Sequence, residues 1–187
     1  MRSSAEPSEW ERLDRHLYEG TMTLRDVLAA EAACIRYDLD EADAILVKNT
    51  RFDPTFAAFA RRCRSEGVPM TVLSSGVEPL IRRAFEREGL ADVPVRANRV
   101  DASPRGWRFL FRDASANGHD KAAAVRSARR EGLLTAFVGD GHSDFEAALE
   151  ADRRFAKRGR DLEAYLQKNG VEFTPFDRFN EVEAALF

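Results

Sequence analysis

Several features that define specialised classes of protein are scarce or missing in this sequence. Its 187 residues include two cysteines, Cys34 and Cys63, without the spacing of a metal-binding motif. Their small number suits buried thiols in a reducing compartment, with a single disulfide as the alternative. No stretch approaches the ~18 apolar residues of a membrane span, and residues 1–20 lack the apolar core of a secretory signal. These absences predict a soluble cytoplasmic protein with no membrane partner.

An excess of positive charge is also missing. The 29 basic and 32 acidic residues are interspersed and give a formal net charge of −3. This distribution lacks the basic footprint of a nucleic-acid-binding protein and the polybasic patch of a membrane-attached one, so neither partner is expected. Hydrophobic residues make up 44% of the chain, which is enough for a packed core.

The pattern of predicted elements changes near the end of the first quarter of the chain. Residues 1–50 show helical periodicity and few strand signals, which predicts a small helical module. In residues 51–187, helices alternate with short apolar strands, including predicted strands at 70–73, 134–138 and 171–173. This alternation predicts an α/β fold, with helices on both faces of a parallel sheet. In such a fold, chemistry lies at the carboxyl ends of the strands.

The first candidate site follows the predicted strand at 70–73, in the stretch TVLSSG. Ser74, Ser75 and Gly76 offer a hydroxyl and backbone amides close to the start of a helix, a combination that favours binding of an anion. The same three residues also suit an ordinary turn, and this stretch alone does not decide between the two interpretations.

The second candidate site is the glycine loop VGDGHSD, between the strand at 134–138 and a helix. Carboxylates at such a loop suit Mg²⁺, with Asp140 as a direct ligand and Asp144 holding a metal-bound water. The alternative makes Asp140 a turn residue and Asp144 an acid favoured by the helix dipole. We expect His142 to face solvent, because a hard cation does not select imidazole.

The third candidate is Lys121 in the stretch NGHDKAAAV, at the start of a helix predicted over residues 121–130. A positive charge is disfavoured at a helix N-terminus, so a lysine here makes sense if it binds an anion at the strand ends. A solvated surface lysine is the alternative.

Taken together and in this order, the three motifs resemble those of the haloacid dehalogenase superfamily of phosphohydrolases. That superfamily has a strand-end Ser or Thr, a Lys, and a strand-end Gly-Asp-x-x-x-Asp, which match TVLSSG, GHDK and VGDGHSD. The likeness extends over most of residues 10–185. It is nearest to the branch with a helical cap, which holds phosphoserine phosphatase-like enzymes and the methionine-salvage phosphatases of 2-hydroxy-3-keto-5-methylthiopentenyl-1-phosphate. Residues 1–50 would then be the cap and residues 51–187 the core.

The resemblance implies a role for each candidate residue in a Mg²⁺-dependent phosphatase acting on a small phosphorylated metabolite. Ser74 and Lys121 would be catalytic: Ser74 would bind the phosphoryl oxygens with the amides of Ser75 and Gly76. Lys121 would neutralise charge as the transition state develops. Asp140 and Asp144 would hold the metal.

The printed sequence departs from the family at one important place. The family's nucleophile and general acid lie in an Asp-x-Asp-x-Thr signature after the first strand, and no such segment stands ahead of the cap here. Asp38-Leu39-Asp40 is the only Asp-x-Asp, but it lies among predicted helices and reads better as a turn, with Asp40 capping the helix that follows. The resemblance also implies that the missing strand lies between those carrying Ser74 and Asp140. We therefore expect the chain to be inactive as written.

Three functional hypotheses follow from this reading. The first is a capped phosphatase without its nucleophile segment, and the second is a non-catalytic module that binds a phosphometabolite or a protein. The third is a receiver-like signalling domain, against which the helical leader and the Gly-Asp-x-x-x-Asp loop argue. The sequence does not decide the oligomeric state, although an unpaired strand position would favour a homodimer.

Overall fold

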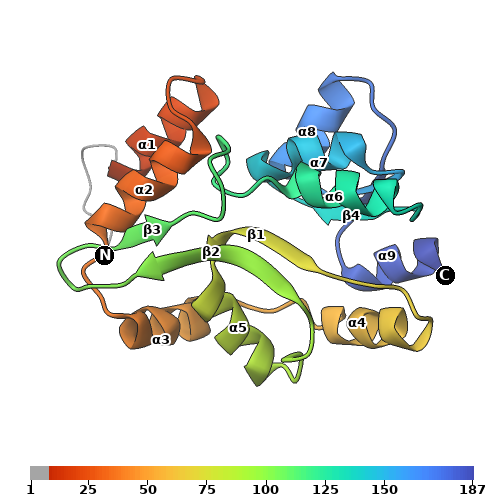
Figure 1. Cartoon of the computed structure of the whole chain (residues 1–187), viewed down its shortest axis with the longest axis horizontal. Coiled ribbons are helices and arrows are strands. Elements are labelled where there is room, and N and C mark those ends of the chain that lie inside the picture. Colours follow the sequence, from red (N-terminus) through yellow and green to blue (C-terminus); the bar gives the residue numbers. More distant parts are fainter. Residues whose placement is uncertain (1–8) are drawn as a thin grey trace. The chain divides into compact units, whose positions relative to one another are not determined.

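The computed structural model describes residues 9–187 and has the α/β character that the sequence predicts (Figure 1). The helices are α1 (Glu9–Tyr18), α2 (Leu24–Cys34), α3 (Leu39–Asn49), α4 (Phe56–Ser65), α5 (Glu78–Arg87), α6 (Lys121–Arg130), α7 (Phe145–Glu150), α8 (Asp161–Lys168) and α9 (Phe179–Leu186). The strands are β1 (Val72–Val77), β2 (Val95–Asp101), β3 (Arg108–Leu110), β4 (Ala136–Gly139), β5 (Arg153–Lys157) and β6 (Thr174–Phe176).

The strands form two sheets instead of the single parallel sheet that we expected. One has the order β1-β2-β3, and in it β2 and β3 are antiparallel, with Arg99 opposite Leu110. The other has the order β4-β5-β6 and is parallel throughout, with Val138 opposite Phe155. β1 and β4, which carry the candidate motifs, are therefore outer strands of their respective sheets.

All three predicted strands are displaced along the chain, and β4 (136–139 instead of 134–138) differs least. β1 continues to Val77, four residues beyond the predicted end, because the Ser-Ser-Gly stretch pairs as strand instead of turning. β6 covers Thr174–Phe176, whereas residues 171–173 were predicted. These differences arise because strand pairing depends on distant partners more than on local propensity.

The chain divides into two compact units, which are described separately. The first consists of residues 1–50, 74–84 and 96–119, although its first eight residues lie outside the described range, and the second of residues 51–73, 85–95 and 120–187. The division into a cap at 1–50 and a core at 51–187 remains a prediction, since segments far along the chain also belong to the first unit.

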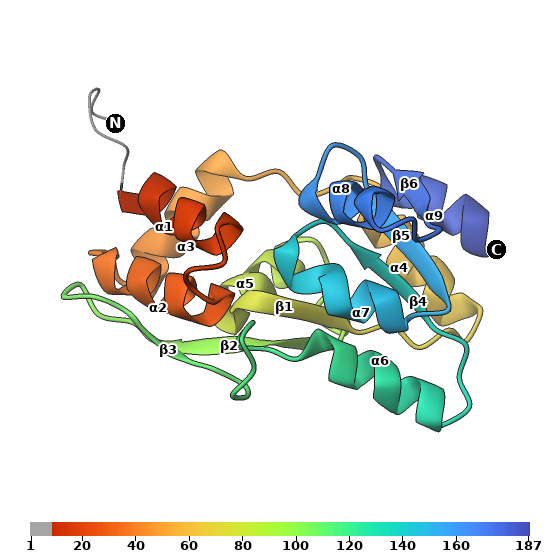
Figure 2. The same ribbon diagram turned by 90° about the horizontal axis from the view of Figure 1, so that it is seen from above.

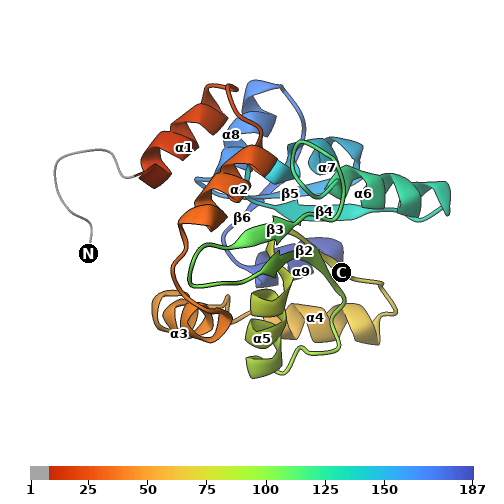
Figure 3. The same cartoon turned by 60° about the vertical axis from the view of Figure 1, so that its left-hand side comes forward.

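The core of the first unit lies around the side chain of Trp107. This indole is 4% exposed and packs with Ala32 and Leu80. Its Nε1–H donates to the carbonyl of Tyr37 at 2.7 Å, so the polar edge of the ring is satisfied. Helix α2 is fixed at its start by a capping box between Thr23 and Asp26, and it lies beside α1 in Figure 3.

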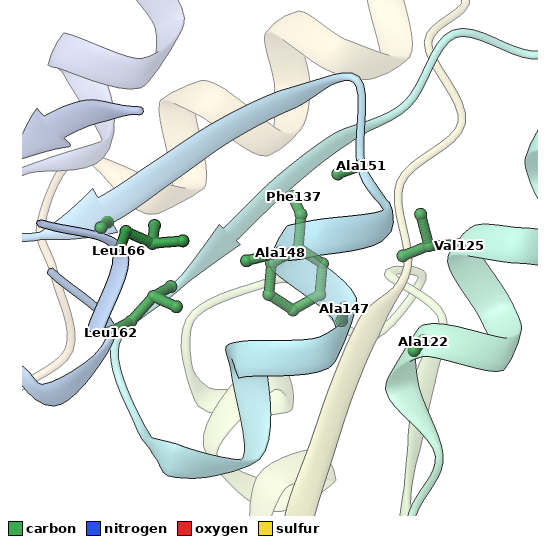
Figure 4. Close-up of a cluster of buried hydrophobic side chains, with 9 residues drawn as sticks. Ala122, Val125, Phe137, Ala147, Ala148, Ala151, Leu162 and Leu166 are labelled. Atoms are coloured by element: carbon green, nitrogen blue, oxygen red, sulfur yellow. The ribbon is translucent and has the colours of Figure 1, made fainter. Parts of the chain in front are cut away.

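The core of the second unit forms between the parallel sheet and helices α6, α7 and α8, and Figure 2 shows α7 alongside β4. Figure 4 shows Phe137 of β4 against the alanines of α7, with Leu162 and Leu166 of α8 nearby. The small side chains Ala147 and Ala148 are each 1% exposed, which lets α7 lie close to the sheet. Burial of this cluster fixes β4, the strand that ends at the candidate metal loop.

A polar clamp in the second unit joins the start of α4 to the start of α9, which lie next to each other in Figure 1. Asp53 accepts hydrogen bonds from the amide and hydroxyl of Thr55 and from the amide of Phe179. Burial alone would raise the pKa of Asp53, but these hydrogen bonds from Thr55 and Phe179 hold it below its ordinary value. Asp53 therefore ties the starts of these two helices together.

Candidate functional site

The Ser74 region belongs to the first unit and lies within β1. The amide of Gly76 donates to the Ser74 Oγ at 3.0 Å, which leaves the hydroxyl proton of Ser74 available to another acceptor. The side chain of Ser75 is buried, and within residues 9–187 its hydroxyl has no hydrogen-bond partner. Successive backbone amides of an extended strand face opposite edges of the strand. The amides of Ser74 and Gly76 therefore face the same edge.

Two residues that the sequence did not single out hold the backbone of this region. The side-chain amide of Asn98 on β2 donates to the Ser75 carbonyl at 2.8 Å, and His119 Nδ1 lies 3.0 Å from the Ser74 carbonyl. Both side chains are buried, with exposed fractions of 0% and 5%. The only sequence signal for them was the place of His119 in the GHDK motif.

The Lys121 region belongs to the second unit. Lys121 is the first residue of α6, as predicted, and its side chain is buried instead of lying in solvent. Its Nζ lies 2.7 Å from Asp144 Oδ1 and donates to the hydroxyl of Ser143, also at 2.7 Å. An ammonium has three N–H donors, so one remains for a further acceptor. Ser143 is a third residue that the sequence reading missed.

Three hydrogen bonds from the protein hold the carboxylate of Asp144. Its Oδ1 pairs with Lys121, and its Oδ2 accepts from the amides of Asp140 and Gly141 at 2.9 and 3.0 Å. Gly139 makes room for this carboxylate, because a Cβ at that position would lie 2.7 Å from Asp144 Oδ2. Asp144 therefore fixes the loop and the lysine at the same time.

Asp140 follows β4 directly, and its side chain is exposed. Its backbone is held on both sides, because its amide donates to Asp144 and its carbonyl accepts from the amide of Leu162 at 3.0 Å. Within the described range, no group of three His, Cys, Asp or Glu side chains is arranged to hold a metal ion. A single open carboxylate nevertheless fits Mg²⁺, which takes many of its ligands from water and phosphate. It does not fit a zinc-type site.

The prediction that His142 faces solvent is wrong. Its side chain is half-buried, and its ring packs against Phe145 with the ring centroids 4.8 Å apart. Phe145 in turn stacks on Tyr165 at 4.0 Å, so three rings pack in a row beside the glycine loop. The imidazole is held by this aromatic packing, and a metal is not needed to explain its position.

The turn at Asp38 has the helix-to-helix character that we predicted, but the capping residue is different. Asp38, and not Asp40, caps α3 by accepting from the amides of Asp40 and Glu41. Asp40 pairs with Arg83 at 2.7 Å at the surface of the first unit. Asp38 therefore serves as a helix cap and Asp40 as one side of a surface ion pair. These contacts give neither aspartate the role of a nucleophile.

The candidate residues thus form two clusters. Ser74, Ser75 and Gly76 lie in the first unit, and a second cluster in the second unit contains Lys121, Asp140 and Asp144. Within the second cluster, hydrogen bonds join Lys121 to Asp144 and Asp144 to the backbone of Asp140. No helix within residues 9–187 combines the length and apolar character that a membrane crossing requires.

A sequence-family model and individual related proteins point to the same family. The sequence model described as haloacid dehalogenase-like hydrolase matches residues 6–149. The protein named Pdp3-interacting factor 1 of Schizosaccharomyces pombe is 32% identical over 185 residues, which cover 93% of this chain and 80% of that protein. The polyol phosphate phosphatase PYP1 of Saccharomyces cerevisiae is 31% identical, with coverage of 90% and 76%.

More distant similarities agree with this result. A 2-hydroxy-3-keto-5-methylthiopentenyl-1-phosphate phosphatase of Microcystis aeruginosa is 28% identical, over 71% of this chain and 63% of that protein. A substrate-bound phosphoserine phosphatase structure superposes with a TM-score of 0.70 and 17% identity, covering 96% of this chain and 85% of that one. At this identity the structural likeness concerns the fold alone.

Proposed function

Because the chain belongs to the haloacid dehalogenase-like hydrolase family, we propose that it is a phosphatase scaffold that binds the phosphoryl group of a small phosphorylated metabolite. The observation that carries this proposal is the buried pair of Lys121 and Asp144, directly beside the open carboxylate of Asp140. Burying an ammonium and a carboxylate is costly, and a salt bridge repays that cost only in part. The remaining N–H donor of this buried ammonium, next to an exposed acid, supports a site for a charged ligand.

Each residue has a role that its contacts permit. The hydroxyl of Ser74, whose Oγ accepts from the amide of Gly76, donates a hydrogen bond to a phosphoryl oxygen. The third N–H of Lys121 binds a phosphoryl oxygen and offsets its negative charge. Asp140 would hold Mg²⁺ while Asp144 fixes the loop around it, and the bound ion would supply further neutralisation of the phosphoryl charge. Phosphate binding by the amides of Ser75 and Gly76 stays a prediction, and in the structure the amide of Gly76 donates to Ser74 Oγ.

The attacking carboxylate is the part that the printed sequence does not supply. An aspartyl-phosphate route needs a carboxylate oxygen that bonds to phosphorus as the ester bond breaks, and a second acid that protonates the leaving oxygen. Asp38 and Asp40 are committed to a helix cap and an ion pair. We therefore expect the printed chain to bind a phosphate monoester and not to hydrolyse it.

The proposal predicts the outcome of a paired assay. The assay compares the printed chain with an extended chain, in which a strand ending in Asp-x-Asp-x-Thr precedes the same sequence. Both receive Mg²⁺ and a panel of small phosphate monoesters that includes polyol phosphates and phosphoserine. Phosphate release is expected from the extended chain only, and it should stop when EDTA removes the metal or when Asp140 is replaced in Asp140→Asn. An extended control beginning Asn-x-Asp-x-Thr should be inactive, because an amide does not attack phosphorus.

Two results of this assay would count against the proposal. Equal activity of the printed and extended chains would mean that another residue is the nucleophile. An extended chain that binds phosphate but releases none would favour the second candidate function, a non-catalytic module that binds a phosphometabolite or a protein. The names of the yeast and bacterial phosphatase relatives favour catalysis on small phosphorylated molecules. A cytoplasmic location and a homodimer belong to the same proposal.

A further inference from the structure

Two buried side chains hold the backbone carbonyls of successive residues in the Ser74 region. Asn98 is fully buried, and both polar atoms of its side chain are used: its Nδ2 donates to the Ser75 carbonyl, and its Oδ1 accepts from the amide of Arg112 at 3.0 Å. His119 lies against the carbonyl of Ser74. Because a carbonyl only accepts, His119 Nδ1 must carry the proton in this contact.

Because the peptide bond is planar, a contact that fixes a carbonyl also fixes the direction of the amide that follows it. In a trans peptide, the C=O of one residue and the N–H of the next point in opposite directions. The carbonyl of Ser75 and the amide of Gly76 are the two halves of one such unit. When Asn98 holds the carbonyl, the amide of Gly76 is directed away from Asn98 and toward Ser74 Oγ, which it reaches at 3.0 Å.

The amide of Gly76 sets the orientation of the Ser74 hydroxyl. Since Ser74 Oγ accepts from Gly76, the hydroxyl proton points elsewhere and is available to a phosphoryl oxygen. His119 holds the preceding peptide unit, which contains the carbonyl of Ser74 itself. The backbone on either side of Ser75 is therefore fixed from two different segments of the chain.

We propose that Asn98 and His119 are positioning residues, which orient the hydroxyl of Ser74 toward a bound phosphoryl group by holding the two peptide units that follow Ser74 Cα. The inference rests on the proposed function, because it concerns the same phosphate site. Asn98 acts through the peptide unit of Ser75 and Gly76, and His119 acts through the peptide unit of Ser74 and Ser75. Neither side chain needs to touch the phosphate.

The test is a titration of the isotope-labelled full chain with inorganic phosphate. Binding is monitored by NMR through the amide signal of Gly76. Asn98→Asp keeps the acceptor for Arg112 but cannot donate to Ser75, and it should weaken phosphate binding about tenfold. His119→Leu, which has no donor, should weaken binding by a similar factor. His119→Asn places an N–H donor near the position of Nδ1 and should stay within about threefold of the wild type.

A matched control separates positioning from loss of stability. Val27→Ala lies in the core of the same unit, away from Ser74 in sequence, and should lower the melting temperature while leaving phosphate affinity unchanged. The inference is overturned if Asn98→Asp binds phosphate as well as the wild type, or if His119→Asn and His119→Leu bind it equally. If the wild type shows no response at Gly76, both this inference and the proposed function fail. If Ser74→Ala weakens binding but the Asn98 and His119 variants do not, the inference alone fails.

Discussion

Replacing Lys121 by methionine is expected to lower the free energy of unfolding by about 3 kcal/mol, a large share of the ~5–15 kcal/mol of a typical domain. Lys121 and Asp144 are both buried and lie 2.7 Å apart. Lys121→Met leaves the Asp144 carboxylate buried without its counter-charge. The effect should lie at the lower end of the range for broken buried pairs, because Asp144 keeps the amides of Asp140 and Gly141.

Urea denaturation followed by circular dichroism measures this loss, and two variants serve as controls. Lys168→Met removes an exposed lysine from α8 and should change stability by no more than about 0.5 kcal/mol. Adding Asp144→Asn to Lys121→Met removes the unpaired charge, so the double variant should recover part of the loss. If Lys121→Met were as stable as Lys168→Met, the pair would not be buried as described.

Replacing Gly139 by alanine is expected to destabilise the second unit by about 2 kcal/mol, through steric overlap with Asp144. A Cβ at this position would lie 2.7 Å from Asp144 Oδ2 and 2.8 Å from its Cγ. Asp144 cannot move aside without losing its contacts with Lys121 and with the amides of the loop. Gly139→Ala should therefore disturb the lysine and the loop together, and it should weaken phosphate binding as well as stability.

The same loop contains a matched control for this substitution. Gly141→Ala makes the identical chemical change two residues away, where a Cβ would meet no atom within 4 Å and the backbone is extended. Its stability should stay within about 0.5 kcal/mol of the wild type. Melting curves of the two variants decide the matter, and equal effects at the two positions would refute the steric role given to Gly139.

The three motifs TVLSSG, GHDK and VGDGHSD could be identified from the sequence, because each is defined by residues that are neighbours in the chain. Lys121 stood out because a helix seldom begins with a positive charge, and the structure accounts for it through a buried partner 23 residues away. Asp140 could be placed at a strand end because an apolar run precedes it. The family likeness rests on such local motifs.

The residues that the sequence did not reveal act over long distances along the chain. Asn98 lies in a strand between Ala97 and Arg99, and its partner Ser75 is 23 residues earlier. Gly139 looked like any loop glycine until the side chain of Asp144 filled the space beside it. The end of β1 was misplaced for the same reason, since local turn propensity competed with pairing to β2. Roles of this kind depend on tertiary contacts and on the pairing of strands.

In the proposed function, the site in the second unit brings Lys121 and Asp140 to one phosphoryl group. A crystal structure of the full chain grown with Mg²⁺ and inorganic phosphate tests it most directly. We predict a phosphate that accepts a hydrogen bond from Lys121 Nζ, with Mg²⁺ on the carboxylate of Asp140. A phosphate that does not contact Lys121, or Mg²⁺ bound away from Asp140, would contradict the account.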